Sequence, residues 1–69
     1  MLNKVIYEMI TRNEKYEIVK EKCRKYDPIN NVVFGKPQIT YHVNERNGEW
    51  CNSYKTLREA RQAFNNMDL

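Results

Sequence analysis

Cysteine and histidine are scarce in this chain, which excludes several kinds of stabilising site. Its 69 residues include two cysteines, Cys23 and Cys51, and one histidine, His42. A structural zinc site takes four such ligands, and the spacing of these three residues fits no zinc pattern. Two cysteines form at most one bridge, so no disulfide framework is encoded. We expect residues 1–69 to form one small domain with a modest core of its own.

Long apolar runs are missing too. The N-terminal segment MLNKVIYEMITRN is interrupted by Asn3, Lys4 and Glu8, whereas a secretory signal needs a longer unbroken apolar stretch. No segment approaches the roughly 18 apolar residues of a membrane span. The sequence therefore predicts a cytoplasmic protein with reduced thiols and no membrane contact.

Ligand-binding motifs built on glycine or on clustered acids are absent as well. The sequence has no GxGxxG, no P-loop, no HExxH and no Asp/Glu-rich metal loop. Glu8, Glu14, Glu17 and Glu21 are interleaved with lysines, as on a solvated surface. We therefore expect no cofactor and no bound metal.

Charge is nearly balanced, with one local exception. Twelve Lys and Arg residues against nine Asp and Glu residues give a net charge of +3. The run KEKCRK at residues 20–25 holds four of the basic residues and one acid, and Tyr16 and Tyr26 flank it. Such a patch is a weak sign of nucleic-acid binding. The candidate nucleic-acid-binding residues are Lys20, Lys22, Arg24, Lys25, Arg46 and Lys55.

Residues 38–54 carry the clearest local pattern, a β-hairpin turning at Asn47-Gly48. A two-residue type I′ turn needs positive φ at both positions, which Asn and Gly tolerate best. Counting outward pairs Arg46 with Glu49, Glu45 with Trp50, Asn44 with Cys51, Val43 with Asn52, His42 with Ser53 and Tyr41 with Tyr54. The apolar face is then predicted to hold Ile39, Tyr41, Val43, Trp50 and Tyr54. The polar face is predicted to hold Thr40, His42, Asn44, Arg46, Glu49, Cys51, Ser53 and Lys55.

A C-terminal helix over residues 56–66 is predicted to follow the hairpin. Thr56 and Glu59 have the spacing of a capping box, in which Thr56 accepts from the Glu59 backbone N–H. One apolar helical stripe follows at spacings of three and four, consisting of Leu57, Ala60, Phe64 and Met67. We expect this stripe to pack on the apolar face of the hairpin, against Tyr41, Trp50 and Tyr54.

Residues 2–26 admit two interpretations. An apolar three-four repeat, broken only at Arg12, favours one or two helices within 2–26 that end before Asp27-Pro28. The richness in Val, Ile, Tyr and Thr favours strands instead. The segment RNEKY at 12–16 also echoes RNGEW at 46–50. We prefer a second hairpin, and the helical alternative stays open.

Residues 27–37 are expected to be a connection, because they contain Asp27-Pro28, Asn30-Asn31, Gly35 and Pro37. A short edge strand is predicted inside it at 32–34, with Pro37 marking the start of the next strand. The predicted class is α+β, a small antiparallel sheet that contains hairpin 38–54 and packs against helix 56–66.

The polar face of the hairpin raises the question of catalysis, because it brings together His42, Asn44, Cys51 and Ser53. His42 and Cys51 would be diagonal neighbours with Cα atoms about 7–8 Å apart, near the limit for a thiolate–imidazole contact. A catalytic site also needs an oxyanion hole and a substrate pocket, and no glycine-rich loop is available to build them. We interpret this face as a solvated sheet surface and expect no enzymatic activity. An enzyme centred on Cys51 and His42 is the third hypothesis.

The join between hairpin and helix resembles that of known nucleic-acid-binding families. Residues 54–64 read YKTLREARQAF, a strand ending in aromatic-Lys-Thr followed by x-x-Glu-Ala-x-x-Ala-Phe. This is similar to the arm-type DNA-binding domains of phage and transposon integrases, and to the hybrid-binding domains that precede some ribonucleases H. Both families place a small antiparallel sheet on one helix, so the resemblance implies nucleic-acid binding.

The sequence as a whole favours a non-catalytic binding protein that acts through protein–protein contact. Tyr, Asn and Arg are plentiful and suit an interface, and homodimerisation would enlarge so small a core. The richness in Asn, Lys and Tyr suggests an AT-rich coding genome. We therefore expect an inhibitor or adaptor encoded by a phage or other mobile element. The alternative is a nucleic-acid-binding module that uses the basic patch at residues 20–25.

Overall fold

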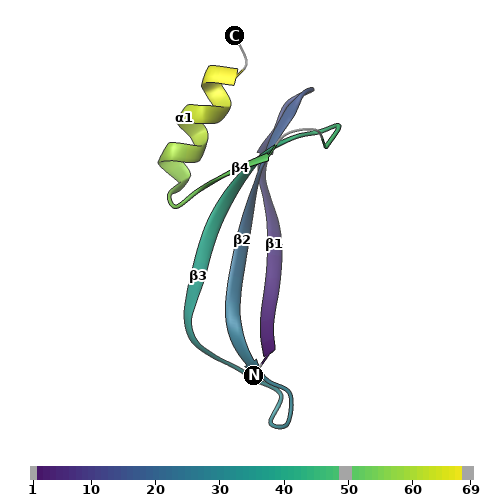
Figure 1. Ribbon diagram of the computed structural model, residues 1–69, viewed down its shortest axis with the longest axis vertical. Coiled ribbons are helices and arrows are strands. Elements are labelled where there is room, and N and C mark those ends of the chain that lie inside the picture. The colour runs from purple at the N-terminus through teal and green to yellow at the C-terminus, as the bar shows by residue number, and fades with distance from the viewer. Residues whose placement is uncertain (1, 49–50, 68–69) are drawn as a thin grey trace.

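The chain forms an antiparallel sheet with one C-terminal helix. A computed structural model describes residues 2–48 and 51–67. The elements in chain order are β1 (Leu2–Arg12), β2 (Tyr16–Asp27), β3 (Val32–Glu45), β4 (Cys51–Tyr54) and α1 (Leu57–Met67). The strands lie side by side in the order β1-β2-β3-β4, and α1 packs at one end of the sheet (Figure 1). The α+β prediction and the second hairpin are confirmed, and the helical alternative for residues 2–26 is wrong.

The turn between β1 and β2 explains why this segment forms a hairpin without glycine. The Asn13 side-chain oxygen accepts hydrogen bonds from the backbone N–H groups of Lys15 and Tyr16, both at 2.8 Å. The Asn13 N–H donates to the Tyr16 carbonyl at 2.9 Å. An Asn side chain that bonds the backbone ahead of it closes a turn with little demand on the central residues.

The strand β3 is longer than predicted, and the connection before it is shorter. β3 begins at Val32, so the strand predicted at 32–34 is confirmed, but it continues through residue 37 into the next strand. The connection is therefore residues 28–31 and not 27–37. Cys23 pairs with Gln38 whereas Lys25 pairs with Phe34, which leaves residues 35–37 as an irregularity opposite Arg24. Gly35 has a φ of 80° there. Pro37 lies within this bulge instead of starting a strand, because a bulge tolerates a residue without an N–H.

The pairing of β3 with β4 has the predicted register. Tyr41 lies opposite Tyr54, His42 opposite Ser53, Val43 opposite Asn52 and Asn44 opposite Cys51. The turn itself differs from the prediction. The Gly48 N–H donates to the Glu45 carbonyl at 2.9 Å, and Asn31 is the one non-glycine residue with positive φ in the described part of the chain. Asn47 therefore has negative φ, and the turn is not type I′.

The predicted pairs that involve Glu49 or Trp50, and the expected inward position of Trp50, lie outside the described residues. The prediction that Cys51 is on the outer face is confirmed, because Cys51 is exposed.

The buried core is small and lies where α1 meets the sheet. Among residues 2–48 and 51–67, three side chains are fully buried there, those of Ile18, Val43 and Ala60. The partly buried residues packed around them are Ile10, Tyr41, Tyr54, Leu57, Phe64 and Met67. The predicted helical stripe and its packing against Tyr41 and Tyr54 are thereby confirmed.

The start of α1 is capped as predicted. The Thr56 hydroxyl accepts from the Glu59 N–H at 3.2 Å and donates to the Glu59 carboxylate at 3.1 Å. The helix runs from Leu57 to Met67, one residue later at each end than predicted. No helix within residues 2–48 and 51–67 is long and apolar enough to cross a membrane.

Candidate interaction surface

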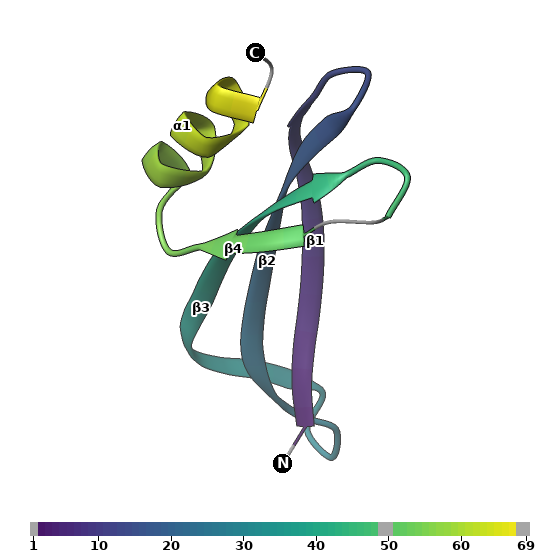
Figure 2. The ribbon, with the colours of Figure 1, turned by 45° about the horizontal axis from the view of Figure 1, so that its top comes forward.

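One half of the sheet is covered by no other element of the described chain. α1 contacts β2, β3 and β4 near Ile18 and Val43, and β4 pairs only with residues 41–44 of β3. Beyond that point three strands continue without β4 and without the helix (Figure 2). We call this region the uncovered half, made up of residues 2–9 of β1, 20–27 of β2 and 32–40 of β3. Both of its faces and both of its edges are open.

The overall dimensions reflect this extension. The radius of gyration is 14.3 Å, against about 11 Å for a globular chain of this length. The accessible surface is 5445 Å², against about 4,600 Å² for a monomer of this mass. The excess of roughly 800 Å² is close to the area that one protein contributes to a standard protein–protein interface. The surface that this chain exposes in excess of a globular fold of its size is therefore about as large as one side of a protein–protein interface.

The exposed apolar side chains gather in the uncovered half, above all on β1. Leu2, Val5, Ile6, Tyr7 and Met9 are between 42% and 63% exposed. Because neighbouring residues of a strand point to opposite faces, this strand presents apolar groups on both faces of the sheet. A strand that is apolar on both faces is typical of a buried position inside a larger sheet. Here it occupies the edge.

Three of the predicted basic residues share one face of the uncovered half. Ile18 points toward α1, and the regular alternation of β2 puts Lys20, Lys22 and Arg24 on that same face. Lys4 lies directly opposite Arg24, so it joins them.

The cations of this face surround a cleft with apolar walls. Lys4, Lys22 and Arg24 line a cavity of about 90 Å³ together with Ile6 and Val33. We call these five residues the basic cleft. The Lys4 ammonium sits 5.8 Å from the centre of the Tyr26 ring, a distance at which a cation and an aromatic face attract. The Arg24 Nη2 donates to the Gly35 carbonyl at 3.1 Å, while its Nε has no acceptor among the described residues.

The other predicted basic residues lie elsewhere. Lys25 projects from the opposite face, where it lines a separate cavity with Asn3 and Gln38. Arg46 lies at the far end of the sheet, where its guanidinium donates to the Asn13 carbonyl at 3.0 Å and ties two turns together. Lys55 lies in the exposed turn between β4 and α1. The six predicted residues are therefore not one site, because only Lys20, Lys22 and Arg24 lie on one face.

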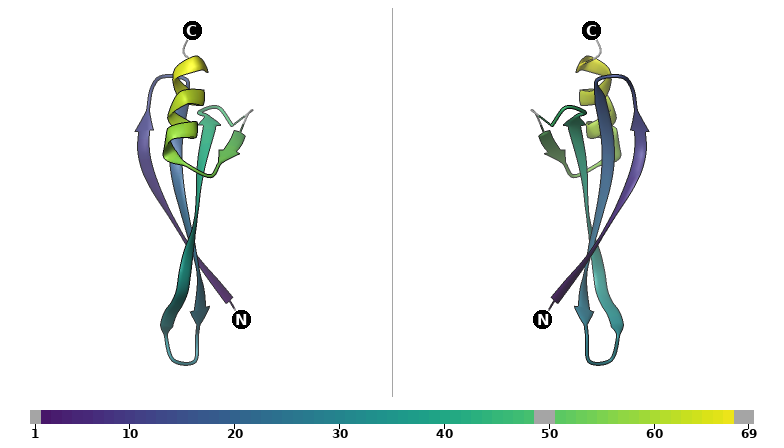
Figure 3. Two further views of the ribbon diagram at one scale, coloured as in Figure 1. Left: turned by 90° about the vertical axis from the view of Figure 1, so that its left-hand side faces the viewer. Right: turned by 90° about the vertical axis from the view of Figure 1, so that its right-hand side faces the viewer.

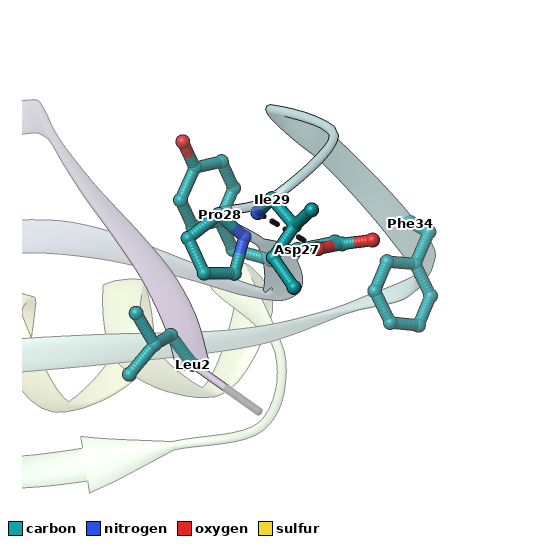
Figure 4. Close-up of a pocket in the computed structure, with 6 residues that line it drawn as sticks. Leu2, Asp27, Pro28, Ile29 and Phe34 are labelled. Carbon is teal, nitrogen blue, oxygen red and sulfur yellow. Dashed lines mark hydrogen bonds between the residues drawn. The ribbon is translucent and has the colours of Figure 1, made fainter.

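A cavity lies at the tip of the sheet, beside the β2–β3 turn. It has a volume of about 380 Å³, and Leu2, Pro28, Ile29 and Phe34 give it apolar walls (Figure 4). The Asp27 carboxylate accepts from the Ile29 N–H at 3.0 Å and from the Asn30 side-chain amide at 2.8 Å. These hydrogen bonds, that of Asn30 foremost, lower the pKa of Asp27. The turn thus holds Ile29, which is 91% exposed, at the end of the molecule.

The polar face of the hairpin holds a hydrogen-bonded trio that the sequence did not predict. His42 Nδ1 is 2.9 Å from the Ser53 hydroxyl, and its Nε2 is 3.2 Å from the Glu21 carboxylate. Nε2 donates to Glu21, and in neutral histidine Nδ1 accepts from Ser53. The connectivity is that of a hydrolase triad, but the ring nitrogens are exchanged relative to the serine-protease arrangement. The trio links β2, β3 and β4, and we assign it that structural role.

Lys4 is a residue of the basic cleft that was not among the basic residues predicted from the sequence. Lys4 joins the basic cleft only because β1 runs antiparallel to β2 in the observed register. That register depends on a bulge between Met9 and Thr11 and on the Asn13 turn. The echo of residues 46–50 in residues 12–16 indicated a hairpin but gave no register for it. The exposed apolar residues of β1 include the sequence run Val5-Ile6-Tyr7, whose burial was not predicted from the sequence.

Comparison of the chain with models of known protein families, with curated proteins and with solved structures found no match.

Proposed function

We propose that this chain is a non-catalytic binding protein that contacts another protein through the uncovered half of its sheet. The observation that carries the proposal is the set of large apolar side chains left exposed on β1, on both faces of a sheet with no cover. Proteins that act alone seldom expose contiguous apolar patches of this kind, and such patches mark interaction sites. A role as an adaptor or inhibitor fits a chain whose main feature is a contact surface.

The basic cleft defines the chemistry of the partner. Lys4, Lys22 and Arg24 surround Ile6 and Val33, so cations rim an apolar floor. Interfaces with an apolar centre and a charged rim are typical of protein–protein contacts. A partner that places carboxylates around an aliphatic or aromatic side chain would match this face in both charge and polarity.

A binding experiment with paired charge-reversal variants tests the proposal. Wild type and a variant carrying Lys22→Glu and Arg24→Glu are each used as bait in a lysate of the cells in which the protein occurs. The control carries Arg58→Glu and Arg61→Glu, which change the net charge equally on the exposed side of α1. We expect a protein that wild type and the helix control both retain and the cleft variant loses. Equal capture by all three baits, or capture of nothing by any, would reject the proposal.

Nucleic-acid binding is the second candidate, favoured by the grouping of Lys4, Lys22 and Arg24 beside the Tyr26 ring. Cations can contact phosphates while an aromatic side chain stacks on a base. Fluorescence titration with duplex and single-stranded DNA and RNA tests it. Binding through the cleft should weaken steeply as salt rises and should be lost in the Lys22→Glu, Arg24→Glu variant. No binding at low salt removes this candidate.

A further inference from the structure

The outer edge of β1 is the most open pairing surface in the described chain. β1 is the first strand in the order β1-β2-β3-β4, so its backbone groups on that side face no other strand. Figure 3 shows this edge free of α1, which lies over β2, β3 and β4. The strand has 11 residues and contains neither proline nor glycine. A long apolar edge strand of this kind is a template for pairing with another strand.

We propose that β1 pairs antiparallel with β1 of a second copy of this chain, with Ile6 opposite Ile6. Two copies related by a two-fold axis perpendicular to the sheet would join into one continuous eight-stranded sheet. The proposal goes beyond the proposed function, because it uses the backbone edge of β1; Lys4 and Ile6 also belong to the basic cleft, whereas Lys22 and Arg24 on β2 take no part in the pairing.

The sequence of β1 is self-complementary in this register. With Ile6 on the axis, Lys4 of each copy lies opposite Glu8 of the other, so two pairs of opposite charge form. Val5 of each copy lies opposite Tyr7 of the other, which gives two pairs of a β-branched and an aromatic side chain. Both kinds of pair are among those that stabilise adjacent antiparallel strands.

The neighbouring symmetric registers lack this match. An axis through Val5 puts Lys4 opposite Ile6 and Glu8 opposite Leu2. An axis through Tyr7 puts Glu8 opposite Ile6 and Lys4 opposite Ile10. In both, each charged side chain faces an aliphatic one, so the pairing of charges selects the register centred on Ile6.

This arrangement covers the open edge of β1 and leaves both faces of the joined sheet open to a partner. Lys4 alone is the kind of charge that protects an edge strand from pairing, but in the proposed register Glu8 neutralises it. Because the two-fold axis is perpendicular to the sheet, the two basic cleft regions lie on the same side of the joined sheet. A partner with two acidic sites would therefore meet both.

Charge reversal tests the proposal on the protein alone, by sedimentation equilibrium over a range of concentrations. Wild type should approach twice the 8.4 kDa chain mass at high concentration. Lys4→Glu and Glu8→Lys should each shift association to at least tenfold higher concentration, because they place like charges opposite each other. The double variant Lys4→Glu, Glu8→Lys should restore association. A wild-type chain that stays monomeric throughout, or a double variant as weak as the singles, overturns the proposal.

Cysteine cross-linking tests the register independently of the charges. In a Cys23→Ser, Cys51→Ser background, Ile6→Cys should form a covalent dimer on mild oxidation. Opposed Cα atoms lie about 4.5–5.5 Å apart, within disulfide range. Val5→Cys is the control, because the two copies of residue 5 are diagonal neighbours about 7–8 Å apart. Equal cross-linking of both variants, or preferential cross-linking of the Val5 variant, contradicts the register. A monomeric wild-type chain would reject the pairing of β1 but would not affect binding of a partner at the basic cleft. Failure of this proposal can therefore be told apart from failure of the proposed function.

Discussion

Ile18 on β2 lies directly opposite Val43 on β3, and both side chains are fully buried where α1 packs on the sheet. Ala60 is the one fully buried residue that α1 adds to them in the described chain. The packed core is therefore at one end of the molecule, and the uncovered half extends from it as a three-stranded sheet. The buried core and the exposed apolar side chains of β1 are thus separated along the long axis.

Truncating Ile18 should have a large effect on stability. Ile18→Ala removes one of the three side chains that are fully buried in the described part of the chain, so we expect a loss of about 2–5 kcal/mol in the free energy of unfolding. Ile18→Val should cost about 0.5–1.5 kcal/mol. Urea denaturation followed by circular dichroism gives both values. Equal effects of the two substitutions would contradict the assignment of Ile18 to the core.

The Thr56 cap should contribute to the attachment of α1. Thr56→Ala removes the acceptor of the Glu59 N–H, and a loss of about 1 kcal/mol in the free energy of unfolding is expected. Thr56→Ser keeps the hydroxyl and should restore most of the loss. If serine were no better than alanine, the hydroxyl would not be the capping group.

The β2–β3 turn should depend on pH through Asp27. Its pKa is lowered in the folded chain, first by the Asn30 side-chain amide and then by the Ile29 N–H. The contribution to turn stability is therefore present above the ordinary pKa of aspartate and is lost as pH falls through the lowered pKa. NMR titration of the Asp27 carboxyl should show this lowered pKa, and Asn30→Ala should move it upward. A pKa at or above the ordinary value, or one unchanged by Asn30→Ala, would contradict the turn geometry.

The trio of Ser53, His42 and Glu21 should act as a structural link between strands. We expect Ser53→Ala to reduce the free energy of unfolding by at most about 1 kcal/mol, because it removes one exposed hydrogen bond. A serine-reactive fluorophosphonate probe should not label the wild-type chain, as judged by intact mass. Labelling of wild type that is lost in Ser53→Ala would revive the catalytic hypothesis for this face.

Local sequence signals predicted the C-terminal half well. The pairing of Tyr41 with Tyr54 followed from counting about Asn47-Gly48, and the capping box placed the start of α1 within one residue. These signals depend on short-range hydrogen bonding and on alternation, which neighbouring residues determine. The type I′ turn was wrong because, of the two turn residues Asn47 and Gly48, only Gly48 adopts positive φ. The register of residues 41–44 against residues 51–54 is nevertheless the predicted one.

Long-range features were harder to predict. The length of β3 depends on the bulge at residues 35–37, where Gly35 and Pro37 are accommodated within a strand instead of ending it. The basic residues were found in sequence as one run, but alternation divides Lys25 from Lys22 and Arg24. Lys4 reaches the same face from another strand. Which cations share a face depends on strand pairing and bulges, which a run of charges does not encode.

Amide hydrogen exchange along β1 tests most directly whether the uncovered half is a contact surface. The outward-facing amides of residues 3–9 are measured from micromolar to near-millimolar concentration, with the Ile18 amide as an internal reference. Alternate amides of β1 should exchange more slowly as the protein concentration rises, whereas the exchange rate of the Ile18 amide should not change. The proposed contact surface would be contradicted if the β1 amides exchanged at the same rate at every concentration and if adding a protein captured in the bait experiment did not slow them either.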